Sequence, residues 1–349
     1  MGLPTRIKSS SDIDVLLGSL SAKIRDELRL WQYYVLDRVK ERTNVLTALN
    51  AGVPTWHGPD MKGKSVEELA ALLRELDKIE GLGQFAARYG VKVNGKVAAS
   101  LIKAVFPDMS DPEELATAWV RVVDVINVPL YREWEEDTKV ALENIRNRVE
   151  YTRLADHGPK LGEITSTNPL VESYFTRLPH NSTTSTHPRS ALSLANNGWI
   201  WNADPLQNFA LLPSKSYLRR EVIVWGDCVK LRYGDSPASN PWLWDYMTSY
   251  VTSLASIFDG FRIDNCHSTP LNVGMVLLDK ARVVRPDLYV CAELFTGSEE
   301  MDVYFVSRLG INSLIREAYN GHDPKDLSRL LYRFGVDRPI GENILYPSL

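Results

Sequence analysis

The sequence predicts an α/β protein in which a long helical part precedes parallel strands that alternate with helices. Apolar residues recur at helical spacing in the first part of the chain. Two later apolar segments, 258–264 and 288–294, read as strands with a helix-length segment between them. Each segment ends on or near a carboxylate, Asp264 and Glu293. Strand, helix and strand in this order are typical of right-handed βαβ units, and active sites of parallel α/β sheets and barrels lie at the carboxyl ends of the strands.

The helical part is predicted from its apolar spacing and its capping residues. Apolar side chains follow the helical period over residues 16–49. Ser65 and Glu68 form a capping box that opens a helix to about residue 79. Asp111 is placed to cap a further helical pattern, which we expect to be broken into two helices near Pro129. We see no catalytic constellation in this part, and its charged residues read as a solvated face.

The second part begins where Pro, Gly, Ser, Thr and Asn dominate the composition. Residues 158–197 are predicted to form a long exposed loop. A strand-like segment covers residues 198–205, and residues 218–230 mix charged with β-branched residues. Helices are predicted over residues 242–257 and 272–284, and a further apolar segment covers residues 310–315. These βαβ units are too few for a complete eight-fold barrel. We therefore divide the chain into a helical domain, residues 1–157, and a strand-bearing domain, residues 158–349.

The bulk composition excludes several classes of protein. The 349 residues are 44% hydrophobic and 24% charged, with a net charge of −4, which is typical of a soluble globular protein. No Lys/Arg-rich stripe is present, which argues against nucleic acid and against an anionic membrane surface. No apolar run approaches the roughly 18 residues of a membrane span, and no signal-peptide core opens the chain, so we expect a cytoplasmic location. The three cysteines fit no zinc motif and no acidic cluster has calcium-loop spacing, so we expect no metal and no cofactor.

The strand-end carboxylates suit the chemistry of glycosidic bonds. A retaining glycosidase or transglycosylase needs one carboxylate as nucleophile and a second as acid and then base. Asp264 fits the nucleophile, and Arg262 lies two residues before it, on the same side of a strand, where its charge would keep Asp264 ionised. Glu293 fits the acid/base, and we expect its apolar neighbours Ala292 and Leu294, with Phe295 beyond them, to shield it from water.

Each of these residues also has a purely structural interpretation. An Asp that ends a strand often caps the following helix, and Arg262 with Asp264 can be a buried ion pair. His267 can bind a sugar hydroxyl or can simply orient the helix-start turn at residues 268–270. Aromatic residues can stack on pyranose rings or pack in the core. This second ambiguity applies to a cluster that comprises Trp199, Trp201, Trp225, Trp242, Trp244 and Tyr246.

Longer strings resemble a known family. Residues 260–264 followed by Ala292 and Glu293 look like two signature segments of the α-amylase superfamily. More specific strings are similar to the eukaryotic glycogen debranching enzyme family. They cover residues 197–199, 204–206, 218–221, 225–227, 230–234, 264–271, 292–299, 308–311 and 313–318. The resemblance spans essentially the whole chain and disfavours a plain α-amylase-type hydrolase.

The resemblance implies a 4-α-glucanotransferase that acts on glycogen, limit dextrin and maltooligosaccharides. It assigns Asp264 as the nucleophile, Glu293 as the acid/base and Arg262 as the support of Asp264. The residues expected to contact substrate are His267, Asn265, Trp199, Asp204, Asp227 and Arg232. The family's α-1,6-glucosidase part is expected to be missing from this chain.

Two departures from the superfamily pattern shape the remaining expectations. An early Asp-x-x-x-Asn-His segment is not found, and neither is a later His-Asp pair with a third carboxylate; His322 and Asp323 read instead as the start of a helix. We therefore predict a partial (β/α)8 TIM-type barrel with a helical insertion domain, and a partner in the missing remainder of the enzyme. Because a third carboxylate would add transition-state stabilisation, we expect the isolated chain to be weakly active at best. The alternative is a non-catalytic α-glucan-binding fragment.

Overall fold

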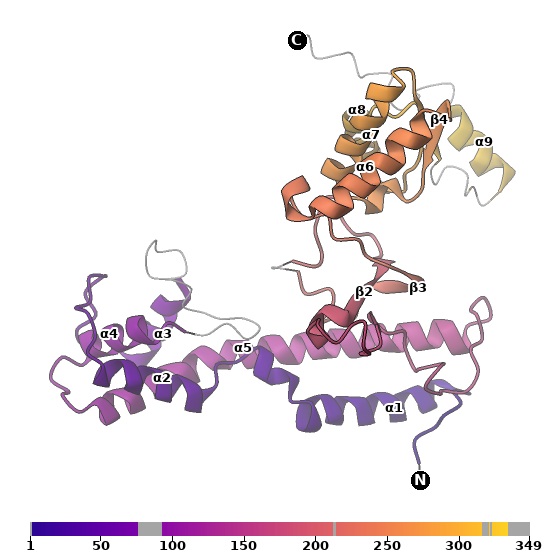
Figure 1. Ribbon diagram of the computed structural model, residues 1–349. Helices are drawn as coiled ribbons and strands as arrows, with labels where there is room; N and C mark the ends of the chain where they lie inside the picture. The colour runs from indigo at the N-terminus through magenta and orange to yellow at the C-terminus, as the bar shows by residue number, and fades with distance from the viewer. Residues whose placement is uncertain (1, 76–92, 212–213, 316–320, 322, 334–349) are drawn as a thin grey trace. The chain divides into compact units, whose positions relative to one another are not determined.

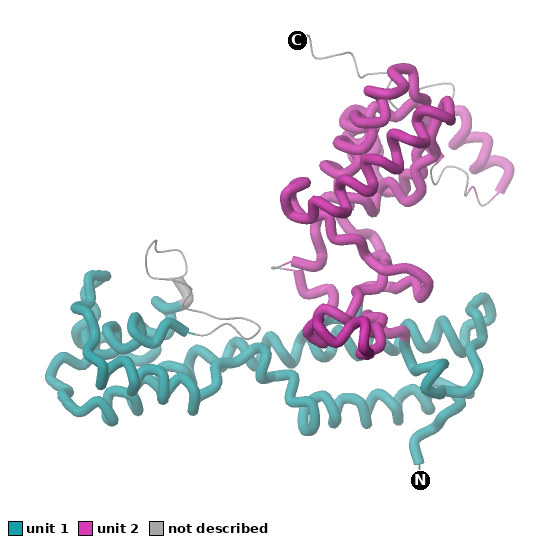
Figure 2. The backbone as a smooth tube through the Cα atoms, viewed as in Figure 1, with its two compact units in different colours: residues 1–171, 218–220 teal, residues 172–217, 221–349 magenta. Residues whose placement is uncertain are grey.

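The computed structural model describes residues 2–75, 93–211, 214–315, 321 and 323–333 (Figure 1). The chain divides into two compact units (Figure 2). Unit 1 comprises Met1–Val171 and Leu218–Arg220, and unit 2 comprises Glu172–Tyr217 and Glu221–Leu349. Unit 1 thus extends past the boundary at residue 157 that the composition suggests. The division into domains at that boundary stays a proposal.

Unit 1 is helical, and its longest helix organises the others. Its helices are α1 (Ser10–Ala22), α2 (Arg38–Asn50), α3 (Val66–Glu75), α4 (Gly95–Val105) and α5 (Pro112–Val149), with short helical turns at Lys23–Glu27, Leu30–Tyr33 and Glu150–Leu154. Helices α2, α3 and α4 pack against the first half of α5 around the fully buried Trp119. Helix α1 lies beside the second half of α5 (Figure 1), through a separate cluster that includes Ile13 and Ile145.

The predicted helix starts are confirmed, whereas the helical pattern over residues 16–49 is interrupted. Ser65 and Glu68 exchange the two hydrogen bonds of a capping box, and Asp111 accepts from the backbone N–H of Glu113. The expected end of the first of these helices, near residue 79, lies outside the described residues. Between α1 and α2, Arg29 adopts a left-handed backbone with a φ of 48°. A helix cannot continue through such a residue, so the pattern is divided into separate helices.

The prediction that the helix of unit 1 breaks near Pro129 is wrong. Helix α5 runs without interruption for 38 residues with Pro129 inside it. An interior proline removes one backbone hydrogen bond and costs about 3 kcal/mol. Packing on both sides of the proline offsets this cost, because Val122 lies in one buried cluster and Val149 in another. Burial of long apolar faces therefore decides the continuity of the helix here.

Unit 2 begins with a three-stranded antiparallel sheet in a region that we predicted in part as loop. Its strands are β1 (Phe175–Arg177), β2 (Ser193–Trp199) and β3 (Ile223–Val229), in the order β1-β2-β3. The loop prediction is wrong for β1 and for most of β2. Gly198 explains one feature of β2, because a Cβ there would lie 2.5 Å from the carbonyl oxygen of Ile223 on β3. The close approach of the two strands requires glycine at this position.

A parallel sheet follows and confirms the predicted alternation of strands and helices. Its strands are β4 (Gly260–Ile263), β5 (Tyr289–Glu293) and β6 (Ser313–Ile315), paired in that order, and its helices are α6 (Pro241–Ala255), α7 (Leu271–Val284) and α8 (Glu299–Leu309). Val290, Ala292 and Leu294 pack with Phe305 in a buried cluster between strands and helices. Successive strand residues alternate sides, so Cys291 and Glu293 lie on the other face of the sheet. The chain is thus a mixed α/β protein.

Helix α9 (Pro324–Tyr332) is the last element that the structure describes. It begins as predicted, because Asp323 is its N-cap and accepts from the backbone N–H of Asp326 at 2.7 Å. His322 lies outside the described residues. Across the described parts of the chain, every helix is too short or too polar to cross a bilayer.

Candidate active site

The register of β4 and β5 brings the two predicted catalytic carboxylates to one edge. Ile263 pairs with Ala292 in the parallel ladder. Asp264 and Glu293 are the next residues of the two strands, so they continue the same register at the carboxyl edge of the sheet. The sequence prediction that both side chains meet there rests on this parallel pairing.

Arg262 joins the two carboxylates. Its Nη2 atom lies 3.2 Å from Oδ1 of Asp264 and 3.8 Å from Oε1 of Glu293. One nitrogen atom therefore contacts both groups, and the two oxygens are no further apart than the sum of these distances. The positive charge between them reduces the repulsion that two nearby carboxylates would otherwise experience. The side chains of Arg262 and Asp264 are 58% and 74% exposed, so this is not the buried ion pair that we considered.

The structure also argues against a capping role for Asp264. Its carboxylate bonds to Arg262 rather than to a backbone N–H. The short 3-10 helix that follows, Cys266–Ser268, has Asn265 as its N-cap residue and no side-chain cap, and α7 begins after Pro270. Asp264 is therefore left open to solvent at the strand end.

Glu293 is more enclosed than Asp264, although not by Ala292 and Leu294. Its side chain is 18% exposed. Its Oε2 atom accepts a hydrogen bond of 2.9 Å from the backbone N–H of Asn265. Ala292 and Leu294 are fully buried in the helix-covered core, because neighbours in a strand point to opposite faces. The expectation that these two residues shield Glu293 is therefore wrong.

His267 connects the loops that follow β4 and β5. Its Nδ1 atom accepts from the backbone N–H of Phe295 at 3.2 Å, and the two rings lie 5.8 Å apart. A neutral imidazole that accepts at Nδ1 carries its proton on Nε2, which can then donate to a ligand. Cys266 in the same loop packs in the buried cluster between strands and helices, and its burial raises the pKa of the thiol to about 11.

The other predicted substrate contacts lie on the antiparallel sheet or in the segments between and after its strands. Trp199 ends β2 and packs against Trp201 with ring centroids 5.4 Å apart. Asp204 accepts from the backbone N–H of Leu206 at 2.9 Å, which is a local turn contact. Asp227 lies within β3, and the carbonyl of Arg232 accepts from the side chain of Asn240. Within the described residues, none of these four residues forms a hydrogen bond or an ion pair with Asp264 or Glu293.

The aromatic cluster separates into buried and exposed members. Trp244 is 2% exposed, and its indole N–H donates to the carbonyl of Tyr233 at 3.0 Å, so the core interpretation applies to it. Trp242, two residues earlier, is 72% exposed. It stacks on Tyr246, with centroids 5.5 Å apart and ring planes 14° from parallel. These aromatic residues lie close together in the sequence, but their spacing did not distinguish the buried ones from the exposed ones.

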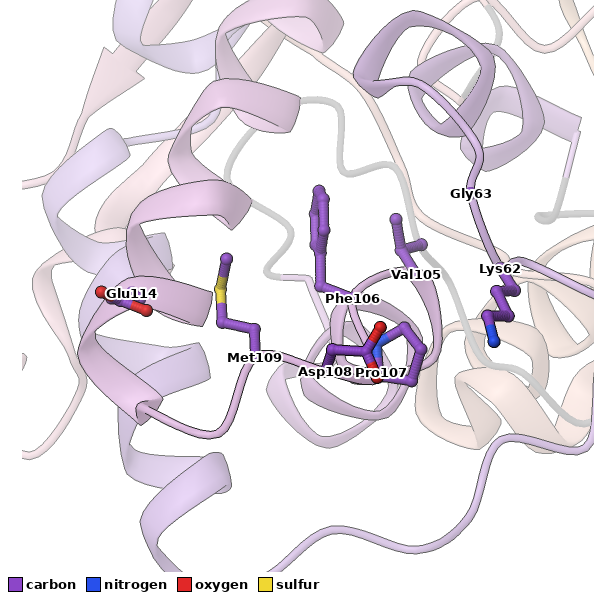
Figure 3. A pocket seen from close by; sticks show the side chains of 8 residues that line it. All are labelled: Lys62, Gly63, Val105, Phe106, Pro107, Asp108, Met109 and Glu114. Carbon is purple, nitrogen blue, oxygen red and sulfur yellow. The ribbon is translucent and has the colours of Figure 1, made fainter.

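A pocket of about 470 Å³ lies elsewhere, in unit 1 (Figure 3). Its lining residues are Lys62, Gly63, Val105, Phe106, Pro107, Asp108, Met109 and Glu114. It contains none of the predicted site residues. In the described ranges, His, Cys, Asp and Glu side chains form no group of three or more that could hold a metal ion. The strand-end cluster is therefore the candidate site with the clearest chemistry.

Comparison with known proteins identifies the family of this chain. The family model described as "Glycogen debranching enzyme, glucanotransferase domain" matches residues 1–289, which include Arg262 and Asp264. The chain is 43% identical over 359 residues to the protein of Saccharomyces cerevisiae (strain ATCC 204508 / S288c) named glycogen debranching enzyme. That match covers 99% of this chain and 22% of the yeast protein. The chain thus spans less than a quarter of the length of this relative.

Proposed function

The chain belongs to the family of the glycogen debranching enzyme glucanotransferase domain, and from this premise we propose that it carries the catalytic pair of a 4-α-glucanotransferase. The observation that carries the proposal is the contact of one guanidinium nitrogen of Arg262 with both Asp264 and Glu293. This arrangement holds two carboxylates near one another at the carboxyl edge of a parallel sheet, where α/β enzymes place their catalytic groups. A retaining double displacement needs two such groups.

In the first step, the carboxylate of Asp264 attacks the anomeric carbon of a donor α-1,4-glucan. Glu293, in its protonated form, donates its proton to the leaving 4-oxygen as the glycosidic bond breaks. The products of this step are a glycosyl ester of Asp264 and the shortened donor chain. The exposure of Asp264 leaves its carboxylate accessible to a donor, and Arg262 stabilises its negative charge.

In the second step, Glu293 acts as the base. It takes the proton from the 4-hydroxyl of an acceptor glucan while that oxygen attacks the anomeric carbon of the ester. The bond to Asp264 breaks, its carboxylate is restored, and the configuration at the anomeric carbon is retained. Transfer rather than hydrolysis requires that an acceptor sugar competes successfully with water.

The proposal extends to substrates, fold and location. We propose glycogen, limit dextrin and maltooligosaccharides as substrates, with His267 donating from Nε2 to a sugar hydroxyl. The three parallel strands would be part of a (β/α)8 TIM-type barrel, and the helical part an insertion domain. The remainder of a longer debranching enzyme would be the partner, in a cytoplasmic location. Trp199, Asp204, Asp227 and Arg232 stay proposed substrate contacts.

A second candidate function is non-catalytic binding of α-glucans. The stacked and exposed pair of Trp242 and Tyr246 favours it, because flat aromatic faces pack well against the apolar faces of pyranose rings. In this alternative, the chain binds glucan without forming a glycosyl ester. The two candidates differ in whether chain lengths are redistributed.

The experiment that separates them is a disproportionation assay on this chain with maltoheptaose, together with glycogen cosedimentation. Asp264→Asn and Glu293→Gln are the inactive controls. Redistribution of chain lengths that both substitutions abolish supports the transferase, even at a low rate. Cosedimentation without redistribution supports the binding fragment. A folded chain that does neither contradicts both candidates.

A further inference from the structure

Asn265 adopts a backbone conformation that most residues avoid. Its φ and ψ are both 46°, in the left-handed region. A side chain with a Cβ is unfavourable there, Asn tolerates it better than most, and Gly adopts it without a penalty. Such conformations persist where the surrounding structure requires them, and they concentrate at functional sites. Asn265 lies directly after Asp264, between the two strand-end carboxylates.

The left-handed conformation determines where the N–H of Asn265 points. The residues after it form the short 3-10 helix Cys266–Ser268, which is held by the buried Cys266 and by the hydrogen bond from Ser268 N–H to the Asn265 carbonyl. With that segment fixed, rotation about φ of Asn265 swings its N–H. At the observed φ, the N–H donates to Oε2 of Glu293 at 2.9 Å. The side-chain amide of Asn265 has no hydrogen bond to any residue that the structure describes.

We propose that Asn265 is a positioning residue that acts on Glu293 through its backbone, rather than a residue whose side chain binds glucan. The proposal rests on the catalytic role proposed above for Glu293. Its left-handed backbone holds Oε2 by a hydrogen bond and thereby fixes the orientation of the carboxyl group. Oε1 is then the atom that carries the exchanged proton. This atom lies on the side of Arg262, which also contacts Asp264, so the proton is delivered next to the nucleophile.

Two substitutions separate the backbone role from a side-chain role. Asn265→Gly removes the side chain and keeps the left-handed conformation accessible, whereas Asn265→Ala removes the side chain and disfavours that conformation. For maltoheptaose disproportionation, we expect the Gly variant to keep kcat within about threefold of wild type and the Ala variant to lose about tenfold, with KM unchanged in both. A side chain that binds glucan predicts instead that Gly loses at least as much as Ala and that KM rises. That result would overturn the proposal.

A second substrate tests whether the loss concerns acid catalysis. In α-maltotriosyl fluoride, the leaving group is fluoride, which departs with little need for a proton from Glu293. We expect Asn265→Ala to release fluoride in the first turnover at a rate within about twofold of wild type. A general disturbance of the loop would slow both substrates equally and would contradict the proposal. Asp264→Asn is the control, because it removes the nucleophile that both substrates need.

A stability measurement, which needs no enzymatic activity, tests the role of Asn265 separately from the proposed function. If wild type redistributes no glucan and releases no fluoride, the transferase proposal fails, and thermal unfolding still tests the hydrogen bond. Asn265→Ala and Glu293→Ala should then lower the unfolding temperature non-additively, with a coupling of about 2–4 °C. Fully additive shifts would show that Asn265 does not hold Glu293.

Discussion

One carboxylate of unit 1 and one of unit 2 have opposite environments. In unit 1, Asp137 is 1% exposed, and both of its oxygens are engaged, one by the hydroxyl of Tyr34 and one by Arg219. In unit 2, Asp264 is 74% exposed and shares Arg262 with Glu293. A buried carboxylate whose oxygens are occupied stabilises a fold, whereas an exposed pair around one guanidinium remains available to a substrate. We expect this difference to separate a structural role, for Asp137, from the proposed catalytic role of Asp264.

The hydrophobic cores of the two units also differ in how completely they are enclosed. Helices α2, α3, α4 and α5 of unit 1 enclose a core on several sides. The parallel sheet of unit 2 is covered by helices on one face, while its other face carries Arg262, Cys291 and Glu293. Substitutions at Asp137 and at Asp264 should therefore affect different quantities, namely stability and the proposed catalysis.

The largest expected effect is on catalysis. We expect Asp264→Asn to lower the rate of glucan transfer by about 10³-fold or more, because a neutral amide cannot act as the nucleophile. The thermal unfolding midpoint should stay within about 1–2 °C of wild type, since Asp264 is exposed. Chain-length analysis and a thermal melt measure the two quantities. A large loss of stability would show that the carboxylate of Asp264 is structural.

The complementary change in unit 1 should affect stability. Asp137→Ala removes the partner of Tyr34 and Arg219, and we expect a loss of about 3 kcal/mol in the free energy of unfolding. Asp124→Ala is a matched control on the same helix, because Asp124 forms an exposed ion pair with Arg38. The control should change stability by less than about 0.5 kcal/mol. Urea unfolding measures both, and equal effects would remove the distinction between buried and exposed carboxylates.

The pH dependence of unit 1 should follow Glu41. This residue is 4% exposed, and its burial raises the pKa of the carboxyl to about 7. The folded state therefore binds the proton more tightly than the unfolded state, whose pKa is near 4.5. The stability of unit 1 should be greatest below that value and should fall as the pH rises towards about 7, by about 3 kcal/mol.

The variant Glu41→Gln provides the control for this prediction. Its side chain keeps a hydrogen-bond acceptor but has no charge to bury. We expect its urea midpoint to change much less between pH 5 and pH 8, and to exceed that of wild type at pH 8. A wild-type midpoint that rises over the same interval would contradict the raised pKa.

The smallest effect compares helix caps in the two units. Asp111→Ala removes a hydrogen bond to the first turn of α5, and we expect it to lower the stability of unit 1 by about 1 kcal/mol. Asp323→Ala removes the equivalent bond at α9, which has no buried residue. Loss of this cap should reduce helicity locally and leave the main unfolding transition unchanged. Circular dichroism during urea unfolding distinguishes the two outcomes, and a shift of the main transition by Asp323→Ala would place α9 in the core fold.

Much of the candidate site could be predicted from the sequence because strand periodicity is a local property. Arg262 and Asp264 are two residues apart in an apolar strand, so they point to the same side whatever surrounds them. The same rule also predicts that Ala292 and Leu294 point away from Glu293, and our expectation that they shield it overlooked this. Helix starts at Ser65 and Asp111 were equally local, since caps depend on neighbouring N–H groups.

Other features depended on contacts between distant residues. Pro129 stays inside a continuous helix because buried clusters on both sides hold it, and no local rule reports that packing. Strands β1 and β2 of the antiparallel sheet lie in a Ser- and Asn-rich region, where pairing rather than propensity makes them strands.

The sequence by itself determined the fold class, the two catalytic candidates and the family, because hydrophobic periodicity and specific residue strings are local properties of the sequence. Only the tertiary structure decided that Arg262 touches both carboxylates and that the backbone of Asn265 donates to Glu293. Both facts depend on the register between β4 and β5, which joins residues about thirty positions apart. Register is set by pairing and packing across the whole sheet, and local patterns do not encode it.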